Sequence, residues 1–136
     1  MNILLTIHSI VRWAITLVAI ALIVRLVLGL VQKRAFDKSA RVLLASFNGL
    51  MDVQLLLGIL LLVVGYSTLG LPRYRLEHAG MMLLAVIVSH IPAAWKKLPD
   101  QIRTRNTLIA VIVALLIIFI AIIPIGGWFR WWHITF

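Results

Sequence analysis

The sequence predicts an all-α integral membrane protein, folded as an up-down bundle of four transmembrane helices. Of its 136 residues, 63% are hydrophobic and the mean hydropathy is +1.11, whereas soluble domains are roughly 45–50% apolar. Four long apolar segments alternate with short polar connections, and each segment reaches the ~20 residues that cross a bilayer core. The chain therefore has room for a single membrane domain, residues 1–136, and for no second folded unit.

The first span, residues 3–31, carries polar groups near both of its ends. His8 and Arg12 lie close to its start, and Arg25 lies near its far end, from where it can reach the interface. A charged side chain at bilayer depth costs at least ~2.5–3.5 kcal/mol, so Arg12 needs a partner or a route to the interface. Because His8 and Arg12 are four residues apart, a helix places them on one face.

The second span, residues 42–66, carries Asn48, Asp52 and Gln54. Asp52 is the deepest acidic residue in the chain. A pair between Asp52 and Arg12 would account for both residues. The alternative role for Asp52 is a proton relay or a contact to a quinone.

The third span, residues 76–96, opens with Glu77 and His78 and carries His90 further on. A carboxylate in the first turn of a helix is favoured by the helix dipole, which would account for Glu77 alone. The fourth span, residues 107–125, has no polar side chain after Thr107. We therefore expect it to face lipid or to serve only in packing.

The basic residues predict the orientation of the bundle. Cytoplasmic loops carry the excess of lysine and arginine, and here the two connections on one side hold eight such residues, against three on the other side (Lys33, Arg34, Lys38, Arg41, Lys96, Lys97, Arg103 and Arg105 against Arg73, Arg75 and Arg130). Both termini are then expected on the outer side of a bacterial inner (cytoplasmic) membrane. Since loops account for the net charge of +9, nucleic-acid binding is not expected.

The aromatic tail, residues 127–133, is expected to anchor the last helix end at the outer interface, where tryptophan is enriched. A role for His133 as a ligand is the alternative.

His8 and His78 are expected to face each other in the outer leaflet. At ~1.5 Å per residue, His8 lies roughly 7 Å and His78 roughly 3 Å below the outer starts of their spans. Two imidazoles on facing helices are a recurrent way to hold a haem iron in a bundle, and without cysteine there is no thiolate ligand and no covalent haem. The pattern predicts haem b on His8 and His78, with Arg12 near the propionates or Glu77.

His90 lies about 18 Å further along the third span than His78, so it belongs to the inner leaflet. No second histidine is expected at that depth, where Arg25 is the nearest polar group, and one haem is therefore predicted rather than two. The alternative is that His8 and His78 are polar contacts between helices.

Three segments together resemble a family of small bacterial four-span membrane proteins loosely described as cytochrome b-like. They read HSIVRW at residues 8–13, DVQLLLG at residues 52–58, and EHAGMM at residues 77–82 followed by His90. Some members have a histidine at the position of Asp52, so here the resemblance leaves His8 and His78 as the axial pair. It implies a b-type haem protein of electron transfer, between quinone and a periplasmic carrier.

The alternative function is a non-catalytic accessory subunit without its own cofactor, docked to a larger respiratory or photosynthetic complex through the fourth span and the aromatic tail. A transporter is not expected, because internal repeats, broken helices and a polar line through the bilayer are absent from the sequence. No catalytic triad or phosphate loop indicates hydrolytic chemistry.

Overall fold

The computed structural model describes residues 1–127 and 129, and this part of the chain is helical without strands. Four helices are each long and apolar enough to cross a membrane, which confirms the predicted all-α fold with four candidate membrane-spanning helices. Short 3₁₀ helices, η1 and η2, follow α3 and α4 (α1 Asn2–Val31, α2 Lys38–Leu69, α3 Arg73–His90, η1 Ile91–Trp95, α4 Asp100–Ala121, η2 Ile123–Ile125). The role expected for His133 lies outside the described residues.

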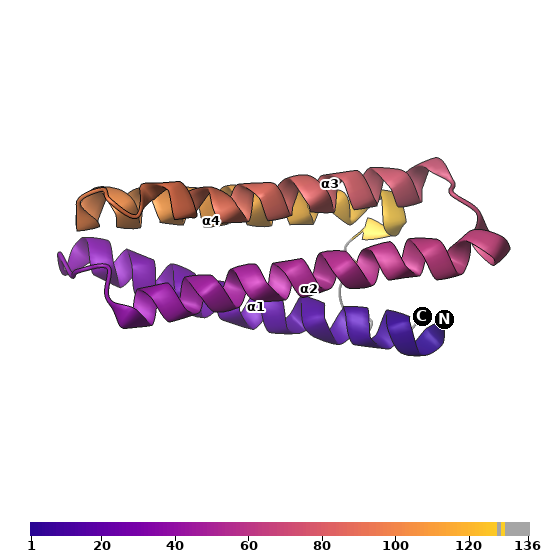
Figure 1. Ribbon diagram of the computed structural model, residues 1–136, viewed down its shortest axis with the longest axis horizontal. Helices are drawn as coiled ribbons and strands as arrows, with labels where there is room; N and C mark the ends of the chain where they lie inside the picture. The colour runs from indigo at the N-terminus through magenta and orange to yellow at the C-terminus, as the bar shows by residue number, and fades with distance from the viewer. Residues whose placement is uncertain (128, 130–136) are drawn as a thin grey trace.

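The helices form an antiparallel bundle in which sequence neighbours pack side by side (Figure 1). α1 packs against α2 and α4, and α3 packs against the same two helices, so α1 and α3 lie on a diagonal. We call the end with the α1–α2 and α3–α4 connections the basic end. The opposite end, with Met1 and the α2–α3 turn, is called the cavity end.

All four helices begin before the spans marked by hydropathy, whereas α3 ends at His90 rather than residue 96 and α4 at Ala121 rather than residue 125. α2 begins at Lys38 rather than residue 42, and α4 begins at Asp100 rather than residue 107, because a helix continues past the hydrocarbon that the apolar residues record. Pro92 and Pro124 lie in the 3₁₀ helices that follow α3 and α4. Proline lacks the N–H that would continue the α-helical ladder.

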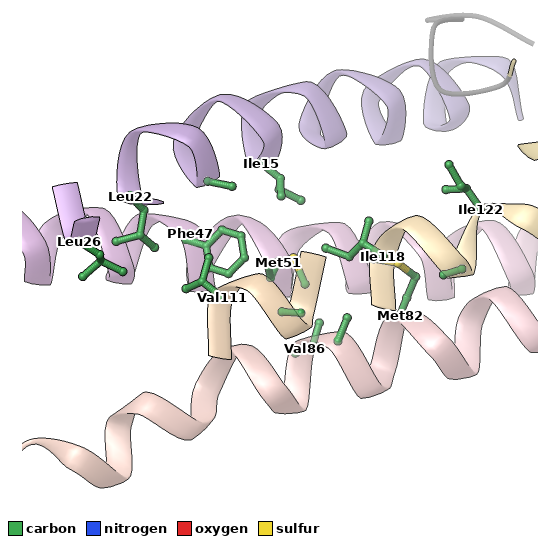
Figure 2. Close-up of a cluster of buried hydrophobic side chains, with 14 of the residues drawn as sticks. Ile15, Leu22, Leu26, Phe47, Met51, Met82, Val86, Val111, Ile118 and Ile122 are labelled. Atoms are coloured by element: carbon green, nitrogen blue, oxygen red, sulfur yellow. The ribbon is translucent and has the colours of Figure 1, made fainter. Parts of the chain in front are cut away.

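The core of the bundle lies between the four helices and extends along most of their length, from Phe36 near the basic end to Ile122 near the cavity end (Figure 2). Leu22, Phe47, Met51 and Val111 are fully buried there. Lipid tails are as apolar as leucine, so close packing rather than exclusion of water holds membrane helices together. Small buried residues allow that approach (Ser9, Ala19, Gly29, Ala40, Gly65, Ala85, Ala114 and Ala121).

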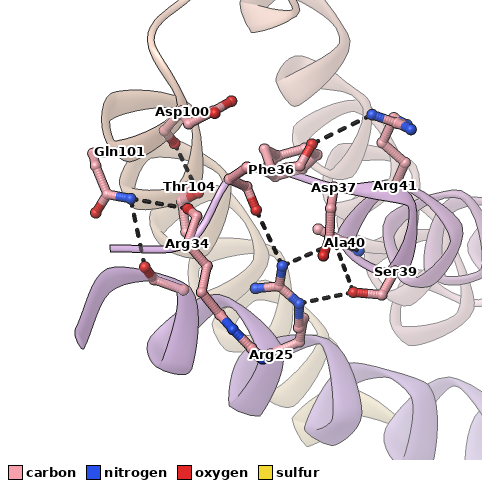
Figure 3. A network of polar contacts seen from close by, with 12 residues as sticks. Arg25, Arg34, Phe36, Asp37, Ser39, Ala40, Arg41, Asp100, Gln101 and Thr104 are labelled. Carbon is pink, nitrogen blue, oxygen red and sulfur yellow. Dashed lines mark hydrogen bonds and ion pairs between the residues drawn. The ribbon is translucent and has the colours of Figure 1, made fainter. Parts of the chain in front are cut away.

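At the basic end, Arg25 joins α1 to the start of α2 (Figure 3). Its guanidinium donates to Ser39 Oγ at 2.8 Å, to the Ala35 carbonyl at 3.1 Å and to Asp37 Oδ1 at 2.9 Å. Asp37 is also the N-cap of α2, because its carboxylate accepts from the Ala40 N–H. Hydrogen bonds from Ser39, Ala40 and Arg25 hold the pKa of Asp37 well below its usual range. Arg25 therefore has its partners within the protein.

α4 is tied to the same end by two further contacts. Gln101 Nε2 donates to the Arg34 carbonyl at 3.0 Å and to the Gly29 carbonyl at 3.5 Å (Figure 3). The Arg103 guanidinium lies 4.0 Å from the centroid of the Phe36 ring, a cation–π contact. Polar groups thus join α1, α2 and α4 at the basic end.

Candidate functional site

Two adjoining cavities open between the helices at the cavity end, with volumes of about 250 and 520 Å³. Both are lined by His8, Arg12, Gln54, His78 and Met82. The rest of their walls is largely aliphatic. A few converging polar groups in an apolar pocket of roughly 300–1,000 Å³ are typical of a cofactor site. The sequence prediction that His8 and His78 lie close together is consistent with this shared lining.

His78 is oriented by a backbone carbonyl of α4. Its Nδ1 lies 2.7 Å from the carbonyl oxygen of Ala121, and since a carbonyl only accepts, Nδ1 carries the proton. This carbonyl has no partner within α4, because the helix ends at Ala121 and the chain continues as η2. Nε2 of His78 is left with its lone pair, which is the arrangement found in histidines that bind metals.

His8 lies against the side chain of Gln54 from α2. Gln54 Nε2 is 3.2 Å from His8 Nε2 and 3.4 Å from His8 Nδ1. The amide is only 4% exposed, and its Oε1 atom has no hydrogen-bond partner within the described chain. Gln54 is therefore part of the site, although sequence reasoning gave it no role. The signal available in the sequence was an amide side chain in the middle of an apolar span.

Arg12 and Arg75 both line the larger cavity. Arg75 donates to the carbonyls of Leu61 and Gly70, both at 2.7 Å. Gly65 makes room for this contact, since a Cβ at that position would lie 2.7 Å from Arg75 Nη2. In the sequence Arg75 counted only as a loop charge, because its reach back onto α2 cannot be read from a hydropathy pattern.

The prediction that Arg12 pairs with Asp52 or Glu77 is wrong, because each of these acids pairs with another residue. Asp52 forms its ion pair with His90, with 3.3 Å between Oδ2 and Nε2, and neither residue lines the two cavities. Glu77 pairs with Arg73, one turn earlier on α3, at an exposed position. Neighbouring residues on a helix point about 100° apart, so the inward direction of His78 turns Glu77 away from the bundle.

Within residues 1–127 and 129, no group of three or more His, Cys, Asp or Glu side chains is arranged to hold a metal ion. A metal held by protein side chains alone therefore has no support in this part of the chain. The pair of histidines provides two ligands at most.

Comparisons with protein-family models, curated proteins and solved structures find no match for this chain. The likeness to cytochrome b-like proteins stays a prediction.

Proposed function

We propose that this protein binds one haem b between α1 and α3 and serves in electron transfer within a membrane. The observation that carries the proposal is that His8 and His78, from helices on a diagonal of the bundle, line the same pair of cavities. A porphyrin supplies four ligands to its iron, so two imidazoles complete the coordination that the protein side chains alone do not provide.

The two histidines differ in how ready they are to coordinate. His78 presents an Nε2 lone pair and is held in place by the Ala121 carbonyl. His8 has the Gln54 amide beside its Nε2, so coordination through this atom requires Gln54 to turn aside. Haem, once bound, supplies one-electron exchange at its iron. The aliphatic walls make the surroundings of both imidazoles largely apolar.

Arg12 and Arg75 are placed to receive the carboxylates of the haem. Both line the larger cavity, where a buried anion would otherwise be costly. Arg75 is held by two backbone carbonyls, so its charge is fixed before any ligand binds. We assign the propionate contacts to this pair of arginines.

The proposed setting is the cytoplasmic membrane of a bacterium. The basic end would face the cytoplasm, because positive charge gathers on that side, and the cavities would lie in the outer leaflet. A quinone and an acceptor on the outer side, or a larger membrane complex, are the partners that suit such a site.

The test is a reduced-minus-oxidised visible spectrum of the purified protein, produced with haem supplied during expression. We expect a sharp b-type α band that disappears in His8→Ala and in His78→Ala. His90→Ala is the matched control: it also removes a histidine from a span, but His90 lies outside both cavities, so the band should persist. Folded protein without pigment, or loss of the band only in His90→Ala, would refute the assignment.

A further inference from the structure

The pair formed by Asp52 and His90 lies on the outside of the bundle, between α2 and α3. Their side chains are 51% and 42% exposed. Asp52 is close to the midpoint of the 32-residue α2, and His90 is at the same depth because the two are in contact. In a membrane this exposure is to hydrocarbon rather than to water.

Hydrogen bonding makes this pair strongly polar. His90 Nδ1 lies 2.9 Å from the Val86 carbonyl, so it carries a proton and donates it. His90 Nε2 lies 3.3 Å from Asp52 Oδ2. The pair therefore presents a carboxyl group and an imidazole to lipid, and ionisable groups in transmembrane helices almost always face a protein interior.

The surface of α2 beside the pair is shaped for a close helix contact. Ala45 and Gly49 are exposed and precede Asp52 by two turns and one turn. A Cβ added at Gly49 would meet nothing within 4 Å. Small residues four apart let two backbones approach closely in lipid, and polar side chains join such helices by hydrogen bonds.

We propose that this face of α2 and α3 docks a second copy of the chain. A two-fold axis along the membrane normal keeps depth unchanged, so it would bring Asp52 of one copy opposite His90 of the other, and the reverse. The face carries both an acceptor carboxyl and an imidazole, and a surface that pairs with itself must be self-complementary in this way. The dimer would cover both polar pairs. The proposed dimer contact depends on no feature of the cavities.

The chain contains no cysteine, so single cysteines can report the contact. Gly49→Cys places a thiol one turn from Asp52, where the added atoms have space. Leu17→Cys is the matched control, because Leu17 is 66% exposed near the midpoint of α1 on another face. After mild oxidation in lipid vesicles, we expect most of the Gly49→Cys protein as a disulfide-linked dimer and at least fivefold less with Leu17→Cys.

A second arm tests the polar pair itself. In Gly49→Cys protein that also carries Asp52→Leu and His90→Leu, cross-linking should fall at least fivefold, while circular dichroism stays helical. Three outcomes would overturn the proposal: equal cross-linking at both cysteines, cross-linking that survives loss of the pair, or cross-linking in native membranes to a different protein instead of a second copy.

Discussion

Replacing Phe47 with alanine should destabilise the bundle by an amount that reveals how it is held together. Phe47 is fully buried in the middle of the core, beside Val111 (Figure 2). In a water-soluble protein, Phe→Ala costs about 3–5 kcal/mol, through lost transfer energy and through the cavity left behind. In a membrane the separated helices keep their side chains in lipid, so the transfer part largely disappears.

The cavity part remains and sets the expected size. Removing the ring leaves a void of about 100 Å³, and at roughly 24 cal/mol per Å³ this costs about 2.4 kcal/mol. Leu56→Ala is the control on the same helix, since Leu56 is 62% exposed and forms little of the packing. We expect that change to stay within about 0.5 kcal/mol.

Unfolding in mixed micelles by increasing mole fractions of sodium dodecyl sulfate, followed by circular dichroism, measures both variants. Equal losses for Phe47→Ala and Leu56→Ala would show that core packing does not hold the bundle. A loss near 4–5 kcal/mol for Phe47→Ala alone would show that the side chain is released into water on unfolding.

Four further substitutions test the two ends of the bundle. Gly29→Ala should lower the stability of the bundle by about 1–3 kcal/mol in the same assay through overpacking, because the new Cβ would lie 2.9 Å from Arg25 Nη1. At Gly80 a Cβ would meet open space, so Gly80→Ala should instead stabilise the bundle by about 0.5–1 kcal/mol. The folded state lowers the pKa of Asp37. The stability that this carboxylate adds to the folded protein is therefore complete above the unfolded-state pKa of about 3.9, and it is lost as the pH falls from there toward the folded-state pKa. Thermal melts between pH 6 and 2 should therefore decline less in Asp37→Asn than in the parent. Arg75→Gln should weaken haem retention by at least tenfold in a haem-transfer assay to apomyoglobin, and equal transfer rates would remove Arg75 from the site.

The number of helices could be predicted from the sequence because hydrocarbon imposes its own thickness on apolar segments. That His8 and His78 lie at a similar depth was also accessible, since up-and-down topology fixes which residues share a depth, and both line the same cavities. Depth is a property of sequence position alone. Both predictions needed no knowledge of how each helix is rotated.

Rotation about the helix axis is what the sequence could not supply. Asp52 and Gln54 are both polar and only two residues apart, which turns them about 200° from each other on a helix. Gln54 is buried against His8 and Asp52 faces outward. In water the polar side of a helix marks its outer face, but inside a membrane a polar residue can mark either face. The expected contact between Arg12 and Asp52 failed for this reason.

The partner of His78 was hidden for a different reason. It is the backbone carbonyl of Ala121, and every residue carries such a group, so no side-chain pattern announces it. The informative signal was Pro124, three residues later, which marks the end of the helix; Ala121 is then in the last turn, where carbonyls lack donors within the helix.

Because the Arg25 network and the cavities lie at opposite ends of the bundle, folding of the helices and binding of a ligand can be separate events. The Arg25 network and the fully buried Phe47 line neither cavity, although Ile15, Met82 and Ile118 belong both to the core and to a cavity wall. The contacts at the basic end can therefore form before any ligand enters the cavities, so the bundle can assemble first and bind a ligand afterwards.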